Sequence, residues 1–379
     1  MKQVYLDNAA TTKIRQEVVD VMTTCLVQNY GNASSTHRFG RSSKTLIESA
    51  RKKIATCLNA SASEIIYTSG GTEANNLVLI SAVRDLGVKR IITTKIEHHA
   101  VLNTVLHLNE THDVEVVYLD IDKQGDINLS QLEVLLQTKV KTLVSLMHIN
   151  NEIGNVLDLK AVANMCQLNN TLFHSDTVQS IGHYAIDLQD TPIDFLVASA
   201  HKFHGPKGVG FLFVRKNIGL NPLIHGGEQE RGLRAGTESL HNIIGMQEAL
   251  SLSYNKLIAE EEYIKTLKTY FISKLEQAIP GATFNGKSGF LEQSAYTIIN
   301  VCLPFKTDAS GMLLFQLDLK GIACSRGSAC QSGSSKKSHV LLEFLDKQDL
   351  EKPSLRFSLS IFNTIDDIDY TVQVLKNMF

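Results

Sequence analysis

The chain has 379 residues, a formal net charge of -2, a pI of about 6.7 and 43% hydrophobic residues, which suits a globular protein of about two to three domains. Its near-neutral charge argues against a nucleic acid or a membrane surface as the partner. No segment reaches the ~18 consecutive apolar residues of a membrane span. The N-terminus also lacks a signal-peptide run, and we therefore expect a cytoplasmic protein.

Short β-rich runs alternate with helical patterns between about residues 64 and 215. The runs predict strands at 64–70, 90–98, 114–121, 141–150, 171–178, 193–203 and 208–215. Helical patterns occupy 72–87, 100–109 and 159–169. This alternation predicts crossover connections and a mostly parallel sheet covered by helices, which places the chain in the α/β class.

A long helical stretch, residues 237–279, ends at Pro280-Gly281 and is predicted to connect two domains. Beyond it, strands at 295–304 and 354–362 are mixed with helices at 309–321 and 366–379, which indicates a smaller α+β domain. We predict three parts, namely an N-terminal segment that packs with the small domain (1–15), a large domain (16–255) and a small C-terminal domain (256–379).

Six cysteines are scattered along the chain, without a C-x-x-C pair or the Cys/His spacing of a zinc site. We therefore expect reduced thiols, most of them buried as small apolar side chains. Cys330 is the exception, because it lies in "GIACSRGSACQSGSSKKSHVL" (321–341), which is too poor in large apolar residues to pack as core. Lys336, Lys337 and His339 follow it; either they favour the thiolate or they are solvated surface charge.

The stretch "YTSGGTEANN" ends a predicted strand in Gly70-Gly71 and opens a helix at Thr72. Backbone N–H groups, the helix dipole and a hydroxyl meet there, which is typical of a phosphate site. An ordinary helix cap made by Thr72 explains the same residues equally well.

Two charged residues stand at the ends of predicted strands: Asp176 in "FHSDTVQS" and Lys202 in "VASAHKFHGPKG". Strand ends converge on the ligand crevice of an open α/β sheet, so the two can face one ligand. Pyridoxal phosphate needs both, since a lysine holds its aldehyde and an acidic residue keeps its pyridine nitrogen protonated. His98 begins the helix after another strand and is predicted to face the same crevice.

The segment Gly281–Ser288, "GATFNGKS", satisfies the P-loop pattern G-x-x-x-x-G-K-[ST]. A working P-loop follows a strand and opens a helix, whereas this segment follows a helical pattern and runs into a strand. We therefore keep a P-loop NTPase only as a remote alternative function.

The chemistry-bearing motifs are spread over essentially the whole chain. In order they are "VYLDNAATT", "GNASSTHRFG", "YTSGGTEANN", "EHHAVLNT", "HINNEIGNV", "HSDTVQSIGH", "ASAHKFHGPKGVGFLFVR", "ERGLRAGTES", "GSACQSGS" and "LRFSLS". As a set they resemble the cysteine desulfurase family, pyridoxal-phosphate enzymes of the class V aminotransferase group. The "GSACxS" form around Cys330 is similar to the first of the two desulfurase groups, which serves iron–sulfur assembly and nitrogenase maturation.

The resemblance implies a fold-type-I architecture, with a mostly parallel seven-stranded sheet in the large domain. Lys202 would form the Schiff base with pyridoxal phosphate, Asp176 would partner the pyridine nitrogen, and Gln179 would donate to the ring hydroxyl. His98 would stack on the ring and move protons. The remaining cofactor contacts would be Gly71, Thr72, Ser199, His201, Asn151 and, from the neighbouring subunit of a homodimer, Thr237.

On the substrate side, the resemblance implies that Asn151 and Arg356 bind the carboxylate of L-cysteine. Cys330 would take the substrate sulfur, leaving L-alanine and a persulfide for an acceptor such as an iron–sulfur scaffold. A Gly/Ser-rich stretch suits a thiol that must meet both the substrate and an acceptor. No metal site is implied beyond a transient contact of Cys330 with a cluster.

The chain departs from the family pattern at several positions. Ala33 stands where Pro is usual, Ser360-Ile361 where Gly-Arg is common, and Cys324 where serine is commoner, so Cys324 is either a buried thiol or a second sulfur relay. The segment "SSKKS" replaces a Leu-Glu-Pro segment. A selenocysteine lyase, another class V aminotransferase or an inactive assembly platform are the alternative functions.

Overall fold

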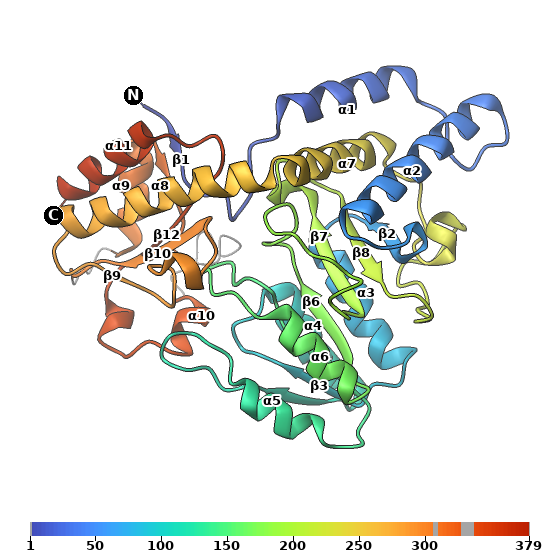
Figure 1. The fold of residues 1–379 in the computed structure, drawn as a ribbon, viewed down its shortest axis with the longest axis horizontal. Coiled ribbons are helices and arrows are strands. Elements are labelled where there is room, and N and C mark those ends of the chain that lie inside the picture. The colour runs from blue at the N-terminus through green and yellow to red at the C-terminus, as the bar shows by residue number, and fades with distance from the viewer. Residues whose placement is uncertain (1, 306–309, 327–336, 379) are drawn as a thin grey trace.

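The computed structural model describes residues 2–305, 310–326 and 337–378 (Figure 1). Cys330 and the lysine at 336 lie outside these ranges. The larger of its sheets has seven strands in the order β2-β8-β7-β6-β5-β3-β4. They are β2 (Ile65–Thr68), β3 (Arg90–Thr93), β4 (Glu115–Tyr118), β5 (Thr142–Ser145), β6 (Leu172–Asp176), β7 (Phe195–Ser199) and β8 (Gly210–Val214).

Strands β7, β6, β5, β3 and β4 pair in parallel, while β8 pairs antiparallel with both β7 and β2. Strands β2, β5, β7 and β8 are buried along their whole length, as expected for strands with helices on both faces. The predicted α/β class and the mostly parallel seven-stranded sheet are confirmed. Compared with the predicted ranges the strands are shorter, and the strand expected to reach residue 98 ends at Thr93.

Helices cover both faces of this sheet and define two hydrophobic clusters. One face carries α3 (Gly71–Arg84) and α4 (His99–His112), whose apolar residues share a cluster with Val197 and Leu212. The other face carries α2 (Arg38–Cys57), α6 (Leu159–Leu168) and α7 (Leu240–Asn255). Helices α1 (Gln16–Gln28) and α5 (Leu129–Leu136) complete this part, and neither they nor α2 had been predicted.

A three-stranded antiparallel sheet, β12-β10-β9, forms beside the first. Its strands are β9 (Thr283–Phe284), β10 (Ile298–Cys302) and β12 (Ser354–Ser358), and its helices are α8 (Leu257–Ala278), α9 (Ser310–Leu319), α10 (His339–Leu342) and α11 (Ile365–Lys376). The first strand of the chain, β1 (Val4–Tyr5), pairs in parallel with β11 (Ile322–Ala323). Val4 and Leu6 belong to the core cluster of α8 and α11, so both termini lie on this side in Figure 1.

The predicted helix 237–279 is two helices, α7 and α8, which run nearly end to end in Figure 1. They meet at Lys256, whose φ of -111° and ψ of 7° leave the helical region. The break falls within a residue of the predicted domain boundary at 255, although that boundary itself stays a prediction. Within the described residues, none of the helices combines the length and apolar character needed to span a bilayer.

The segment Gly281–Ser288 does not have the geometry of a P-loop. It follows helix α8, and β9 lies within it, with no helix opening at Lys287. Lys287 Nζ instead pairs with Asp126 at 2.5 Å, and Ser288 is buried with its hydroxyl donating to Asn285 and Asn300 carbonyls. The NTPase alternative is therefore wrong.

Candidate active site

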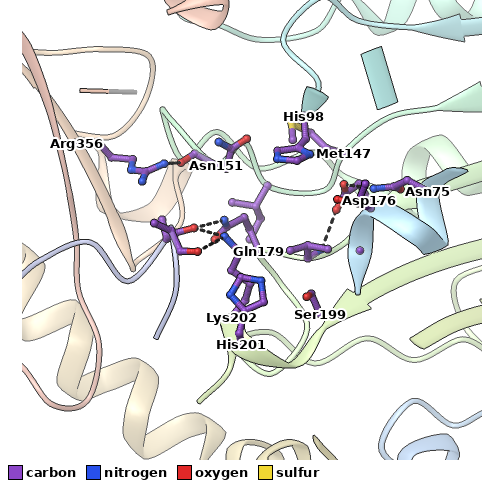
Figure 2. A pocket seen from close by; sticks show the side chains of 16 residues that line it. Asn75, His98, Met147, Asn151, Asp176, Gln179, Ser199, His201, Lys202 and Arg356 are labelled. Carbon is purple, nitrogen blue, oxygen red and sulfur yellow. Dashed lines mark hydrogen bonds between the residues drawn. The ribbon is translucent and has the colours of Figure 1, made fainter. Parts of the chain in front are cut away.

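A cavity of about 210 Å³ opens where the carboxyl ends of the central strands face the second sheet (Figure 2). Eleven of the predicted site residues lie in the described part of the chain. Ten of them line this cavity: Gly71, Thr72, His98, Asn151, Asp176, Gln179, Ser199, His201, Lys202 and Arg356. Residues that had not been predicted complete the lining: Ala9, Ala10, Asn75, Met147, Ile149 and Val178. The eleventh is Thr237, which lies elsewhere. The cavity thus gathers residues from positions 9 to 356.

Asp176 is the last residue of β6 and is only 6% exposed. One of its carboxylate oxygens accepts the Asn75 side-chain N–H at 2.7 Å, and the other accepts the Val178 backbone N–H at 3.0 Å. These bonds fix the carboxylate against the end of the sheet (Figure 2). Asn75, on α3, is the partner that sequence reasoning missed, because nothing in the motif distinguishes it from the neighbouring Asn76.

Lys202 follows β7, in a single 3-10 turn (Ala200–Lys202). Its Nζ donates to the carbonyl oxygens of Ala9 and Ala10, the latter at 2.8 Å. Gln179 Nε2 donates to the same Ala9 carbonyl at 2.9 Å. The N-terminal segment therefore forms one wall of the cavity and holds the amine in place, as the dashed lines in Figure 2 show.

The N-terminus of the 14-residue helix α3 forms the corner of the cavity where the sequence predicts a phosphate site. Gly70 has a φ of +151°, a conformation that favours glycine, and a Cβ on Gly71 would come within 2.7 Å of the Val178 side chain. Ser199 and His201 line the cavity beside this corner. Burial, with the charge of Lys202, lowers the pKa of His201 to about 4, so its ring is neutral at pH 7 and its Nδ1 lies 3.2 Å from the Thr11 hydroxyl.

Arg356, on β12, reaches the opposite end of the cavity and is 1% exposed. One terminal nitrogen donates to the Asn151 carbonyl at 2.8 Å, and the other donates to the Asp7 carboxylate at 2.8 Å. Ser325 also donates to Asp7 at 2.8 Å. Asp7 holds the guanidinium in position, and no sequence signal had pointed to it.

His98 is the N-cap of α4, where its Nδ1 accepts the Ala100 N–H at 3.1 Å. This bond directs the Nε2 side of the ring to the cavity, next to Met147 (Figure 2). His98 thus lines the same cavity as Lys202, while its role stays a prediction.

Thr237 lines a separate hollow of about 430 Å³ with Tyr30 and Cys25 rather than the cavity. Of the thiols within the described ranges, those of Cys25, Cys166 and Cys302 are buried and those of Cys57 and Cys324 are half-buried. Burial raises the pKa of Cys324, with Asp7 adding to the effect, and burial raises the pKa of Cys166 to about 12. These shifts favour the buried-thiol interpretation of Cys324 over the sulfur relay.

The donor set fits pyridoxal phosphate. The corner at Gly71, Thr72 and Ser199 offers backbone N–H groups and hydroxyls to a phosphate, and Gly71 leaves room that a side chain would fill. Asp176 offers a buried carboxylate for a protonated ring nitrogen, and Lys202 offers an amine. Within the described residues, no cluster of three or more His, Cys, Asp or Glu is arranged to hold a metal ion.

The open sheet with a lysine and a carboxylate at adjacent strand ends defines a fold-type-I pyridoxal-phosphate enzyme. The aminotransferase class-V family model matches residues 4–371. Cysteine desulfurases IscS from Dictyoglomus turgidum and Methanosarcina thermophila are 41% and 40% identical to the chain, covering all of it and 94% and 92% of their own lengths. The chain belongs to the class V aminotransferases and, within them, to the cysteine desulfurase family.

Solved structures agree with this assignment. A NifS-like protein superposes with a TM-score of 0.90 at 34% identity, covering 100% of this chain and 99% of the other. SspA in complex with cysteine superposes with a TM-score of 0.82 at 31% identity, covering 96% of this chain and 100% of the other. The predicted family, its cysteine desulfurase activity and its pyridoxal-phosphate cofactor are thereby confirmed.

Proposed function

We propose that the chain transfers sulfur from L-cysteine to Cys330 and then to an acceptor protein, with the cavity residues in the roles that the family pattern predicts. The observation that carries the proposal is the placement of Lys202, Asp176 and Arg356 around one cavity. One relative in structure, SspA, was solved in complex with cysteine, which supports the same substrate here.

The cofactor would lie between Asp176 and Lys202, with its phosphate at the N-terminus of α3. When bound, pyridoxal phosphate supplies an electron sink that loosens the bonds to the substrate Cα and Cβ. Lys202 would hold its aldehyde carbon, and Gln179 would donate to the ring hydroxyl. The carboxylate of Asp176 is already fixed by Asn75 and Val178, so no reorganisation is needed to meet a protonated nitrogen.

The substrate carboxylate would be bound by Arg356 and Asn151. Asp7 and the Asn151 carbonyl fix the guanidinium, which suits a bidentate contact with a carboxylate. His98 would lie over the cofactor and move protons through the ring nitrogen that its helix-capping bond leaves toward the cavity.

The transfer balances in atoms and electrons without a further reagent. The Cβ–S bond of L-cysteine breaks, a S–S bond forms to the Cys330 sulfur, and a proton takes the place of sulfur on Cβ. The products are L-alanine and a Cys330 persulfide. An acceptor thiol, for example on an iron–sulfur scaffold, would then take the outer sulfur, a step suited to the cytoplasmic location expected from the sequence.

A homodimer is the assembly that we propose. Thr237 lies outside its own cavity, so it can meet a phosphate only in a second copy. Beside it, Leu26, Val27 and Tyr30 are 56%, 72% and 73% exposed, and Tyr30 stacks on Phe39 at a ring distance of 5.3 Å. Such an apolar face is typical of a surface covered by a partner.

The test is alanine formation from L-cysteine by the purified protein, with a reductant present to release sulfide. Cys330→Ser should keep the yellow colour of the cofactor and make neither alanine nor sulfide. Cys324→Ser is the matched control and should retain the native rate, because the Cys324 thiol is held protonated. Equal alanine formation by Cys330→Ser would refute the role of Cys330 and direct attention to selenocysteine cleavage or transamination.

A further inference from the structure

Two buried glutamates that this reaction does not use lie directly behind the cavity. Glu97 precedes the cavity residue His98, and Glu152 follows the cavity residue Asn151. Both glutamates are 0% exposed. Burying an acidic side chain costs free energy unless the carboxyl group is hydrogen-bonded, so each of these two glutamates is expected to have specific partners.

Glu97 connects two segments that line the cavity, the one that carries His98 and the one that carries Met147. Its Oε1 accepts the backbone N–H of Met147, a lining residue, at 2.7 Å. Burial, reinforced by the charge of Asp176, raises the pKa of the Glu97 carboxyl well above its usual range. The backbone carbonyl of Glu97 lies 2.9 Å from Nε2 of His339, which donates to it.

Glu152 is hydrogen-bonded to Ser338, the residue before His339. The Ser338 hydroxyl donates to Oε2 of Glu152, and Nδ1 of His339 lies 3.9 Å from Oε1. The backbone of Glu152 is itself fixed, because its N–H donates to Asn150 Oδ1 at 2.9 Å and its carbonyl accepts from Asn300 at 3.0 Å. Ser338 and His339 are therefore bonded to a rigid part of the site.

Apolar and aromatic contacts reinforce this attachment. The His339 ring lies 4.4 Å from the ring of His99, the first residue of α4. The next two residues of α10, Val340 and Leu341, are buried and pack in one cluster with Ile96 and Ile153. The start of α10 is thus held by polar and apolar contacts to the same two wall segments, around 97 and around 152.

We propose that Ser338 and His339 are positioning residues for sulfur transfer, because they fasten the start of α10 to the segments that carry His98 and Asn151. Cys330 precedes Ser338 by eight residues in the sequence, so this attachment fixes the chain at a point eight residues past the thiol. The inference rests on the proposed function and adds residues that touch neither substrate nor cofactor.

The test compares His339→Ala, His339→Gln and the native holoenzyme in steady-state alanine formation from L-cysteine. We expect His339→Ala to lower kcat about 10- to 100-fold with little change in KM, in the cofactor absorbance spectrum or in cofactor content. His339→Gln should recover much of the rate, because an amide N–H can donate to the Glu97 carbonyl. His107→Ala, an exposed histidine of α4, is the matched control and should behave like the native protein.

Three results would overturn the proposal: native kcat in His339→Ala, an equal loss of rate in the alanine and glutamine variants, or a loss of cofactor that accounts for the whole effect. If His339→Ala fails to fold, Ser338→Ala replaces it, since it removes only the hydroxyl bonded to Glu152. A native protein that makes no alanine contradicts the proposed function itself, and the inference falls with it.

Discussion

The two ends of the cavity are built differently. At the end proposed for the cofactor, Asp176 ends β6 and Lys202 follows the neighbouring strand β7, and Asn75 lies on the helix packed against that sheet. At the end proposed for the substrate, Arg356 belongs to the second sheet and is fixed by Asp7, 349 positions away in the sequence. The cofactor end depends on local topology, whereas the substrate end depends on docking between distant segments.

Of the changes considered, replacing Lys202 should reduce the activity most. We expect Lys202→Ala to lower alanine formation by at least about 1000-fold, because the amine proposed to hold the cofactor is lost while the strand ends around it stay in place. Treatment of the native protein with borohydride should fix the cofactor covalently, and the variant should show no fixed cofactor by mass spectrometry. Lys207→Ala, an exposed lysine five positions on, is the control. Covalent cofactor in the Lys202 variant would contradict the assignment.

A change at Arg356 should weaken the substrate end selectively. The three N–H donors of a lysine cannot keep the bonds to the Asn151 carbonyl and Asp7 and also make a bidentate contact with a substrate carboxylate, so Arg356→Lys should raise the KM for L-cysteine about 10- to 100-fold. The cofactor absorbance should stay native, because the bonds of Asp176 and Lys202 are untouched. Arg90→Lys, at an ion pair with the exposed Glu115, controls for the loss of a guanidinium. A KM within about twofold of native would show that another group binds the carboxylate.

The smallest expected effect is a change in stability caused by Lys268, a buried lysine behind the Arg356 end of the cavity. Lys268, on α8, is 0% exposed, and its Nζ donates to Ser294 and to the Ala295 carbonyl, each at 2.8 Å. The Ala295 N–H donates in turn to Gly154, near Asn151. Burial lowers the pKa of Lys268 from 10.5 to about 7.

This depressed pKa gives a signed prediction for stability. Between about pH 7 and 10.5 the unfolded chain binds a proton on Lys268 that the folded chain does not, so the free energy of unfolding should rise with pH. The contribution is at most about 1.4 kcal/mol per pH unit. Lys268→Met should remove this part of the slope in urea unfolding at pH 7, 8 and 9, and Lys274→Met, on the exposed side of α8, should keep it. Equal slopes in all three proteins would contradict the prediction.

The same contrast explains what the sequence could predict. Asp176, Lys202 and the Gly70-Gly71 turn are local patterns at strand ends, and a parallel sheet brings such ends together whatever the rest of the chain does. The bond between Asp7 and Arg356 leaves no local pattern, because its partners meet only when two distant segments dock. Lys268 looks like an ordinary helix lysine until its surroundings are known.

Some elements were missed for similar physical reasons. The break between α7 and α8 at Lys256 has neither glycine nor proline, so the helical pattern runs through it uninterrupted. Asn75 and Asn76 are adjacent and chemically identical, and only the rotation of α3 decides that Asn75 bonds Asp176 while Asn76 bonds the Thr72 carbonyl.

The pairing of β1 with β11 also has a consequence for synthesis of the chain. Val4 pairs with Ile322, and Arg356 with Asp7, so residues made early in translation meet partners that are made much later. All strands of the seven-stranded sheet, and the helices that cover it, lie before residue 256. They can therefore pack while translation continues. A nascent chain thus carries the strand ends around Asp176 and Lys202 before Arg356 exists, and Asp7 gains its partner Arg356 only after β12 has been made.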